Sequence, residues 1–255
     1  MDTGELIELL SAAAMAVDTL VRSMSTEELL QRADGHDDQF ALDVEADRAA
    51  RAVLMPHGLG VLSEESGLHE GSGSILVVVD PVDGSTNCSR RISHYGPSLC
   101  AIDASGPLVS VVHNIHTATT YRAIRGGGAT RNGTVIGRSV HQSVDLVMTG
   151  DPCRELDGPA WTRISGASAH DLCLVADGSV DGYVDHRNTQ SIWDYLGSWL
   201  VVIESGGKIR ERSGADLFDL GARADRRLVA ATSSIQFEAL DRMVRELLPM
   251  GDHGR

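Results

Sequence analysis

The sequence lacks any long hydrophobic run. Among its 255 residues, the longest uninterrupted apolar stretches fall far short of the ~20 residues that a membrane-spanning helix needs. The acidic start Met1-Asp2-Thr3-Gly4-Glu5 also lacks the basic region of a secretory signal peptide. We therefore expect a cytoplasmic protein that has no membrane partner.

Cysteine and positive charge are scarce as well. The four cysteines, Cys88, Cys100, Cys153 and Cys173, include no CxxC pair and have no histidine at zinc-finger spacing, so we expect reduced and mostly buried thiols. The 22 Lys and Arg residues stand against 36 Asp and Glu residues, for a net charge of -14. This balance argues against nucleic acid as a partner, because phosphate recognition needs clustered Lys and Arg. It suits a site that gathers cations, although acidic surfaces also serve solubility.

The hydrophobic pattern predicts an α/β protein of one large unit or two closely joined halves. We expect the halves at 1–150 and 151–255, joined through the stretch 150–158, which is rich in Gly, Pro and Asp. Helical spacing predicts helices at 3–24, 40–54, 167–176, 193–204 and 234–248. Alternating or β-branched runs predict strands at 60–62, 75–79, 98–103, 108–114, 119–124, 182–185 and 228–231.

The segment Asp80-Pro81-Val82-Asp83-Gly84-Ser85-Thr86 is the strongest candidate for a functional site. It follows the apolar run 75–79, which we expect to be a buried strand. Two acids at the tip of a hydrophobic strand repel each other and cost desolvation unless they share a cation. Gly, Ser and Thr then supply backbone amides and hydroxyls at the same turn, so a metal site is the simplest explanation.

Three further acids each have an ordinary explanation when considered alone. Asp47 would lie in the first turn of a helix, where the helix dipole favours a carboxylate, with Asp43 or a neighbour as the cap. Glu64 lies in a predicted loop, where paired glutamates are usually solvated. Asp194 begins a helix that is apolar on nearly all sides, and a cap on a buried helix end also points inward.

A glycine-rich stretch, Arg125-Gly126-Gly127-Gly128, could be mistaken for a phosphate-binding loop. It lacks the Lys-Ser/Thr ending of a P-loop, and the sequence after it predicts no long helix. We expect a tight turn between strands.

Taken together, four separated segments carry a family likeness: Ser63-Glu64-Glu65-Ser66-Gly67, Asp80-Pro81-Val82-Asp83-Gly84-Ser85-Thr86-Asn87, Trp193-Asp194 and Glu204-Ser205-Gly206-Gly207. In this order and approximate spacing they resemble the signature segments of the inositol monophosphatase family. Val44-Glu45-Ala46-Asp47-Arg48 is similar to that family's upstream acidic segment, and the likeness runs from about residue 6 to residue 248. A lone DPxDG motif would be a moderate signal, whereas the ordered set is a strong one.

The resemblance implies a layered α-β-α-β-α sandwich of the inositol monophosphatase and fructose-1,6-bisphosphatase type. It also implies a homodimer and the hydrolysis of phosphate monoesters by a metal-activated water, with roughly two to three Mg²⁺ ions. Position by position, it makes Glu64, Asp80, Asp83 and Asp194 metal ligands and adds the backbone carbonyl of Val82. Oxygen donors of this kind suit Mg²⁺, which is a hard cation.

The resemblance also implies roles around the metal. Ser85 and Thr86, with Asp47 and Glu64, would hold and polarise the attacking water, and the amides of Gly84 and Ser85 would contact the phosphate at the start of a helix. The positions expected to contact the substrate are Gly166, Ala167, Ser168, Asp185 and Arg187. For Asp185, a solvated strand end is an equally good interpretation.

Three functions remain open at this point. The first is a phosphatase for inositol 1-phosphate or a related polyol or sugar monophosphate. The second is a bisphosphate phosphatase for fructose 1,6-bisphosphate or 3′-phosphoadenosine 5′-phosphate, whose second phosphate would need Arg163, His186 or Arg187. The third is a non-catalytic accessory protein in transcription or RNA processing. No basic cluster supports this third function, and four converging acids that repel one another without metal argue against it.

Overall fold

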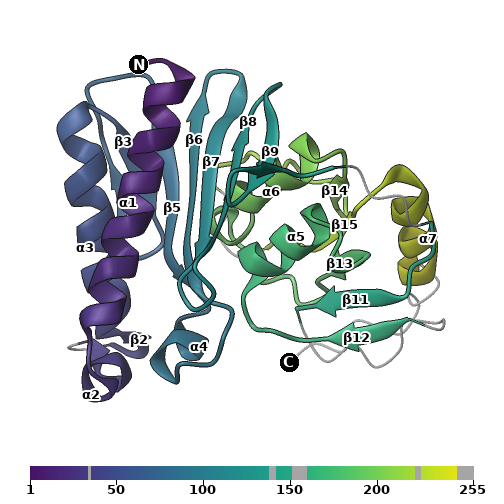
Figure 1. Ribbon diagram of the computed structural model, residues 1–255, viewed down its shortest axis with the longest axis horizontal. Helices are drawn as coiled ribbons and strands as arrows, with labels where there is room; N and C mark the ends of the chain where they lie inside the picture. Colours follow the sequence, from purple (N-terminus) through teal and green to yellow (C-terminus); the bar gives the residue numbers. More distant parts are fainter. Residues whose placement is uncertain (34–35, 138–141, 151–159, 222–224, 246–255) are drawn as a thin grey trace.

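The chain folds into alternating layers of helix and sheet. The computed structural model describes residues 1–33, 36–137, 142–150, 160–221 and 225–245. Within them, helices α1 and α3 cover one face of a large sheet, α5 and α6 fill the space between this sheet and a second one, and α7 covers the outer face of the second sheet (Figure 1). This arrangement is the predicted α-β-α-β-α sandwich. None of the helices in the described residues is long and apolar enough to cross a membrane.

Helices α1, α3, α5, α6 and α7 begin within three residues of the positions that the hydrophobic pattern predicts, whereas α2 and α4 were not predicted from it. The α-helices are α1 (Thr3–Ser23), α2 (Thr26–Leu30), α3 (Ala41–Leu54), α4 (Ser85–Ser89), α5 (Ser168–Ala176), α6 (Leu196–Glu204) and α7 (Ser234–Arg245). Two short 3₁₀ turns, η1 (Met55–His57) and η2 (Ile192–Asp194), precede β3 and α6 respectively.

The larger sheet has eight strands in the order β10-β9-β8-β7-β6-β5-β3-β4. In that order the strands are Thr134–Val135, Gly128–Arg131, Thr119–Ile124, Gly106–Asn114, Gly96–Asp103, Leu76–Asp83, Gly60–Ser63 and Gly67–His69. The pair β3 and β5 is parallel, whereas the other neighbours are antiparallel. A separate short hairpin is formed by β1 (Arg32–Ala33) and β2 (His36–Phe40).

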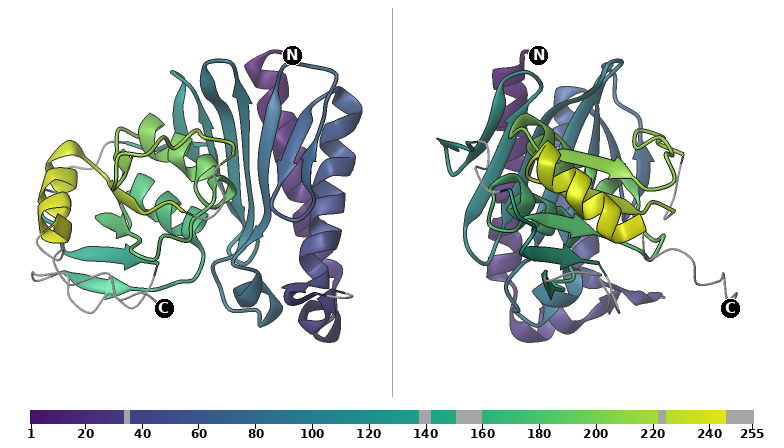
Figure 2. Two further views of the ribbon diagram at one scale, coloured as in Figure 1. Left: turned by 180° about the vertical axis from the view of Figure 1, so that it is seen from behind. Right: turned by 90° about the vertical axis from the view of Figure 1, so that its right-hand side faces the viewer.

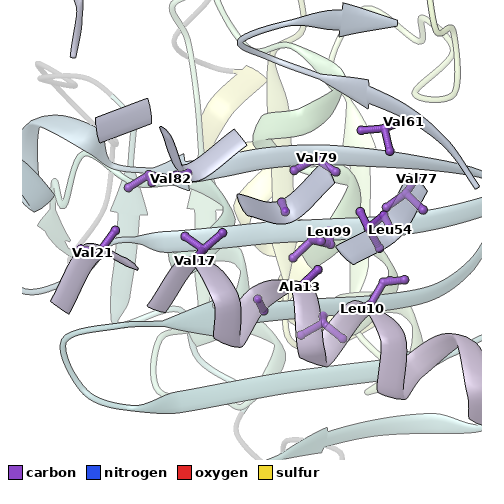
Figure 3. Packing of buried hydrophobic residues seen from close by; sticks show 14 of the residues in the cluster. Leu10, Ala13, Val17, Val21, Leu54, Val61, Val77, Val79, Val82 and Leu99 are labelled. Atoms are coloured by element: carbon purple, nitrogen blue, oxygen red, sulfur yellow. The ribbon is translucent and has the colours of Figure 1, made fainter. Parts of the chain in front are cut away.

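Helix α1 packs on the large sheet through one apolar stripe. Leu10, Ala13, Val17 and Val21 follow the 3.6-residue period and are buried. Figure 3 shows them facing side chains of β5 and β6, such as Leu99. Each fully buried side chain of Leu or Val size contributes about 1.5–3 kcal/mol. The stripe therefore fixes this helix layer against the sheet that carries the Asp80 segment.

The second sheet has five strands in the order β12-β11-β13-β15-β14. In that order the strands are Trp161–Arg163, Leu146–Thr149, Gly182–Val184, Leu228–Ala231 and Lys208–Glu211. Figure 2 shows α7 on the outer face of this sheet, away from α5 and α6. Between the sheets, α6 approaches β6 so closely that a Cβ at Gly197 would lie 2.4 Å from Ser98 Oγ. A glycine is therefore needed where the layers meet.

The structure differs from the expected elements at two points near the candidate site. The strand expected at 75–79 continues as β5 to Asp83, so both acids of the motif belong to the strand. The helix expected from residue 193 begins at Leu196, and Asp194 closes the 3₁₀ turn η2 before it. The hydrogen bond from Ser191 N to Asp194 Oδ2 (2.6 Å) stabilises η2 as a turn distinct from α6.

Several expectations fall on residues outside the described part of the chain. These include residues 151–158 of the expected boundary, Cys153, and the last three residues of the expected final helix. The other cysteines, Cys88, Cys100 and Cys173, are free and buried, as predicted.

The glycine-rich turn after β8 binds a carboxylate of the protein itself. As predicted, the segment from Arg125 to Gly127 is a turn, and it joins β8 to β9. The amides of Gly126 and Gly128 donate to Glu204 Oε1 and Oε2 at 2.8 and 3.0 Å. Because Glu204 ends α6, the turn fastens the central helix layer to the large sheet.

Candidate active site

The acids of the central motif lie at an irregularity of β5. Asp80 pairs with Ser98 of β6 and Asp83 with Gly96, so two residues of β5 face one residue of β6. In a regular strand, residues three apart point to opposite faces of the sheet. The extra residue of a bulge reverses this alternation, which lets both acids serve one site.

Backbone amides hold each of the two acids in place. Asp83 Oδ2 accepts hydrogen bonds from the amides of Ala169 and His170 at 2.8 and 3.2 Å, at the N-terminus of α5. Asp80 Oδ1 accepts one from the amide of Val82 at 3.0 Å. Asp83 thus connects the large sheet to the central helix layer, and its position depends on both.

Three carboxylates from different parts of the chain converge beside β5. One oxygen each of Glu64, Asp80 and Asp194 can be chosen so that all three lie within 4.8 Å of one another. The amide of Glu64 donates to Val79 O at 3.1 Å, which pins the turn after β3 against β5. Such a group of hard oxygen donors can hold a divalent cation.

The cluster is electrostatically unfavourable without a cation. The burial of its carboxylate, followed by the charge of Asp194, raises the pKa of Glu64 to about 8. The rest of the Glu64 residue is exposed to solvent. Burial also raises the pKa of Asp194 to about 6. Burial and then the charge of Glu64 raise the pKa of Asp80 well above its usual value, and burial and then the charge of Asp194 do the same for Asp83. A shared cation would reverse these shifts, because an opposite charge favours the ionised form.

A cleft of about 380 Å³ opens beside these acids. Its walls bring together six of the residues proposed from the sequence, together with Gln190 and Ser191. These six are Glu64, Asp83, Gly166, Ser168, Arg187 and Asp194.

The turn at Gly84 directly follows Asp83 in the chain. Gly84 has φ +81°, and a Cβ there would lie 3.0 Å from the Cβ of Ala167 and 2.9 Å from the carbonyl oxygen of His94. A glycine is therefore required by both conformation and space. Ser85 then begins α4, and the Thr86 side chain is exposed.

Asp47 lies in a neighbouring depression and is not among the residues that line the cleft. This depression, about 490 Å³, is also lined by Glu65, Arg51 and Arg32. Arg51 donates to Asp47 Oδ2 at 2.7 Å. Among the described residues, the other oxygen of Asp47 has no hydrogen-bond partner, and the side chain is 2% exposed.

Asp185 is fully buried, so the alternative of a solvated strand end is wrong. Its carboxylate accepts hydrogen bonds from the amide and guanidinium of Arg187 (2.7 and 2.9 Å) and from Gln190 Nε2 (2.9 Å). It is not among the residues that line the cleft. The structure therefore shows Asp185 holding Arg187 and Gln190, and its contact with a substrate hydroxyl stays a prediction.

Comparisons with known proteins identify the family of this chain. A sequence model of the inositol monophosphatase family matches residues 3–247. This chain belongs to the inositol monophosphatase family. A family member described as fructose-1,6-bisphosphatase/inositol-1-monophosphatase, from Methanothermobacter thermautotrophicus, is 32% identical over 89% of this chain and 91% of the relative. Another, Nus factor SuhB of Salmonella typhimurium, is 28% identical over 80% of this chain and 83% of the relative.

Solved structures show the same fold. The extragenic suppressor protein suhB from Bartonella henselae superposes with a TM-score of 0.82 at 24% identity, covering 96% of this chain and 100% of that chain. The inositol monophosphatase from Anabaena superposes with a TM-score of 0.77 at 24% identity, covering 97% and 98%. The predicted family and fold are therefore confirmed, and membership supports a phosphatase without specifying its substrate.

Asp43 belongs to the electrostatic surroundings of the acidic cluster, a role that was not predicted from the sequence. It was expected as a possible cap, and its Oδ2 does accept a hydrogen bond from the amide of Phe40 at 3.3 Å. Burial and then the charge of Glu65 also raise the pKa of Asp43 to about 8, and its charge acts on Glu64 and Asp80. The spacing of four residues between Asp43 and Asp47 was the available signal, because it places both acids on one face of α3.

We predict that Arg51→Met lowers kcat about 10-fold with little change in KM. The reason is that Asp47 would lose its ion pair and stay buried with both oxygens unpartnered. Arg48→Met is the matched control, since Arg48 lies on the same helix and pairs with Glu45 at an exposed position. Steady-state phosphate release measures both variants, and equal activities would show that Arg51 does not support Asp47.

Proposed function

We propose that this protein hydrolyses phosphate monoesters of polyols or sugars, with inositol 1-phosphate as the first substrate to test and Mg²⁺ as the cofactor. The convergence of Glu64, Asp80 and Asp194 beside the cleft carries the proposal. Membership of the inositol monophosphatase family supports the same reaction. The working form would be a homodimer, which light scattering of the purified protein can measure.

The donor set fits Mg²⁺. The acids offer hard oxygen ligands, and the raised pKa values of Asp80 and Asp83 show that this part of the fold carries negative charge at a cost. Glu64, Asp80, Asp83 and Asp194, with the carbonyl of Val82, would hold the ions. When bound, Mg²⁺ supplies charge neutralisation for the phosphate and lowers the pKa of a coordinated water.

The chain's own groups would position the reactants. The amides of Gly84 and Ser85 would donate to phosphate oxygens at the start of α4, where unpaired backbone N–H groups point outward. Ser85 and Thr86, with Asp47 and Glu64, would hold and polarise the attacking water. Ser168 and Arg187 line the cleft and would meet the alcohol part of the ester, beside Gly166 and Ala167.

A phosphate-release screen tests this function. Purified protein would be incubated with cyclitol, sugar, nucleotide and histidinol phosphates, each with Mg²⁺ and with a chelator. We expect release from inositol 1-phosphate or another polyol or sugar monophosphate that requires Mg²⁺. Absence of release from every ester in the presence of Mg²⁺ would contradict the proposal.

A bisphosphate phosphatase is the second candidate, and the position of Arg187 favours it. This residue lines the cleft and is held by the buried Asp185, so a fixed positive charge faces the space where the substrate would lie. The relative from Methanothermobacter thermautotrophicus carries both fructose-1,6-bisphosphatase and inositol-1-monophosphatase in its name.

We predict that Arg187→Ala raises KM for fructose 1,6-bisphosphate about 10-fold more than KM for inositol 1-phosphate, because hydrogen bonds to a charged group are the stronger ones. Arg163→Ala is the control, since Arg163 lies on the exposed edge strand β12 and is not among the residues that line the cleft. Equal changes in KM for both substrates would remove the support for a second phosphate site.

An accessory role in transcription or RNA processing is the candidate from another class. The relatives named Nus factor SuhB give it support. Affinity purification of the full chain distinguishes this role. Retention of RNA polymerase or ribosomal proteins, together with failure of every phosphate ester, would favour it over catalysis.

A further inference from the structure

His94 has a backbone conformation that is unusual for its residue type. Its φ is +84°, in the left-handed region that favours glycine. Such backbone strain persists when surrounding contacts determine the conformation, and it is concentrated near functional sites. The contacts made by the His94 carbonyl and ring show what determines it here.

The carbonyl of His94 packs against the turn that follows Asp83. It accepts a hydrogen bond from Asn87 Nδ2 at 3.0 Å. It also lies so close to Gly84 that a Cβ there would be 2.9 Å from this oxygen. Asn87 Nδ2 makes a second bond to Ser165 O at 2.8 Å, which reaches the segment just before α5.

The ring of His94 contacts α5. His94 Nε2 lies 3.0 Å from Asp171 Oδ1, and the Asp171 side chain is 2% exposed. The same oxygen of Asp171 accepts a hydrogen bond from Ser165 Oγ at 2.6 Å. Because a carboxylate accepts hydrogen bonds, the His94 tautomer that fits carries its proton on Nε2.

These contacts form a closed circuit around Asp83. The ring of His94 hydrogen-bonds to Asp171 of α5, and amides at the start of α5 donate to Asp83 Oδ2. The His94 carbonyl accepts a hydrogen bond from Asn87 and packs closely against Gly84. His94 lines a separate cavity of about 120 Å³, which shares no lining residue with the cleft. His94 is not among the residues that line the cleft, so we expect it to act there through the groups that it joins.

We propose that His94, through its pair with Asp171, is a positioning residue that sets the Asp83 carboxylate and the Gly84 turn against the N-terminus of α5. The proposal rests on the proposed function, since Asp83 is taken there as a metal ligand. The pair of His94 with the buried Asp171 would make Mg²⁺ affinity and turnover depend on a residue that does not line the cleft.

The test compares His94→Leu, His94→Gln and Asp171→Ala in the full chain. We expect His94→Leu to weaken Mg²⁺ binding and lower kcat by about 10-fold, as for other residues that orient metal ligands. His94→Gln keeps a side-chain N–H that can reach Asp171, so it should retain both properties within about 3-fold. The double variant His94→Leu/Asp171→Ala should show no larger loss of Mg²⁺ affinity and kcat than the more affected single variant, because both substitutions remove the same His94–Asp171 interaction.

Mg²⁺ titration by calorimetry is the first readout, since it needs no substrate. Phosphate release gives kcat and KM, and thermal unfolding shows whether each variant folds. His57→Leu is the control, because His57 is an exposed histidine on η1. A lower unfolding temperature with unchanged Mg²⁺ affinity and kcat would overturn the proposal and leave the pair a merely structural contact. If wild-type protein binds Mg²⁺ but hydrolyses no ester, the proposed function fails, and the Mg²⁺ affinities still decide the role of His94.

Discussion

Asp83→Asn is expected to abolish Mg²⁺-dependent phosphate release, with kcat/KM reduced at least ~10³-fold, or roughly 4 kcal/mol of transition-state stabilisation. The substitution preserves size, so the amide oxygen of Asn can still accept from the amides of Ala169 and His170. The NH₂ group would then take the place of the other carboxylate oxygen. A hydrogen-bond donor there repels a cation, and one negative charge is lost.

A paired measurement separates loss of chemistry from loss of folding. In the absence of metal, Asp83→Asn should unfold at the same or a higher temperature than wild type, because it removes one charge from a buried acidic cluster. Asp103→Asn is the matched control, since Asp103 pairs with Arg125 at a distant exposed turn. Phosphate release by Asp83→Asn at the wild-type rate would contradict the proposed mechanism.

Local periodicity predicted most of the longer helices and strands, whereas the order of the layers was implied by the resemblance to the inositol monophosphatase family. The stripe along α1 and the alternation of β8 are visible in the chain itself. The bulge in β5 was not predictable, because it is defined by pairing with β6. Strand β12 was missed for a related reason: it has three residues, lies at a sheet edge, and is exposed throughout.

The role of the clustered acids as a metal site could be predicted from the whole set, but not from any one of them alone. Glu64 and Asp194 lie far from Asp80 in the chain, and only their order along the sequence pointed to one cluster. The supporting contacts stayed hidden, because the partners are distant: 77 residues separate His94 from Asp171. Such pairings depend on how the layers stack, which periodicity does not encode.

The metal-free protein is expected to lose stability as pH rises from about 5 to about 8. The pKa values of Asp194, Asp43 and Glu64 are raised to about 6, 8 and 8, mainly by burial. Between their ordinary values and these raised values, the folded state binds more protons than the unfolded state, so the free energy of unfolding falls with pH. Glu64 is exposed, so solvent screening reduces its share. One pKa unit corresponds to ~1.4 kcal/mol, and the buried Asp43 alone accounts for a loss of about 3 kcal/mol over this range, or roughly 10 °C in Tm.

Saturating Mg²⁺ at about pH 8 should restore most of this loss, because a ligand at 100 times its Kd stabilises the folded state by ~2.7 kcal/mol. Thermal unfolding at several pH values, with Mg²⁺ and with a chelator, measures both effects. Asp83→Asn should show a shallower pH dependence and a smaller gain from Mg²⁺. A metal-free protein whose stability is constant or rises over this range would contradict the raised pKa values. The desolvation that makes these carboxylates costly without a cation also strengthens their attraction for one, since both effects arise from the low polarity around the cluster.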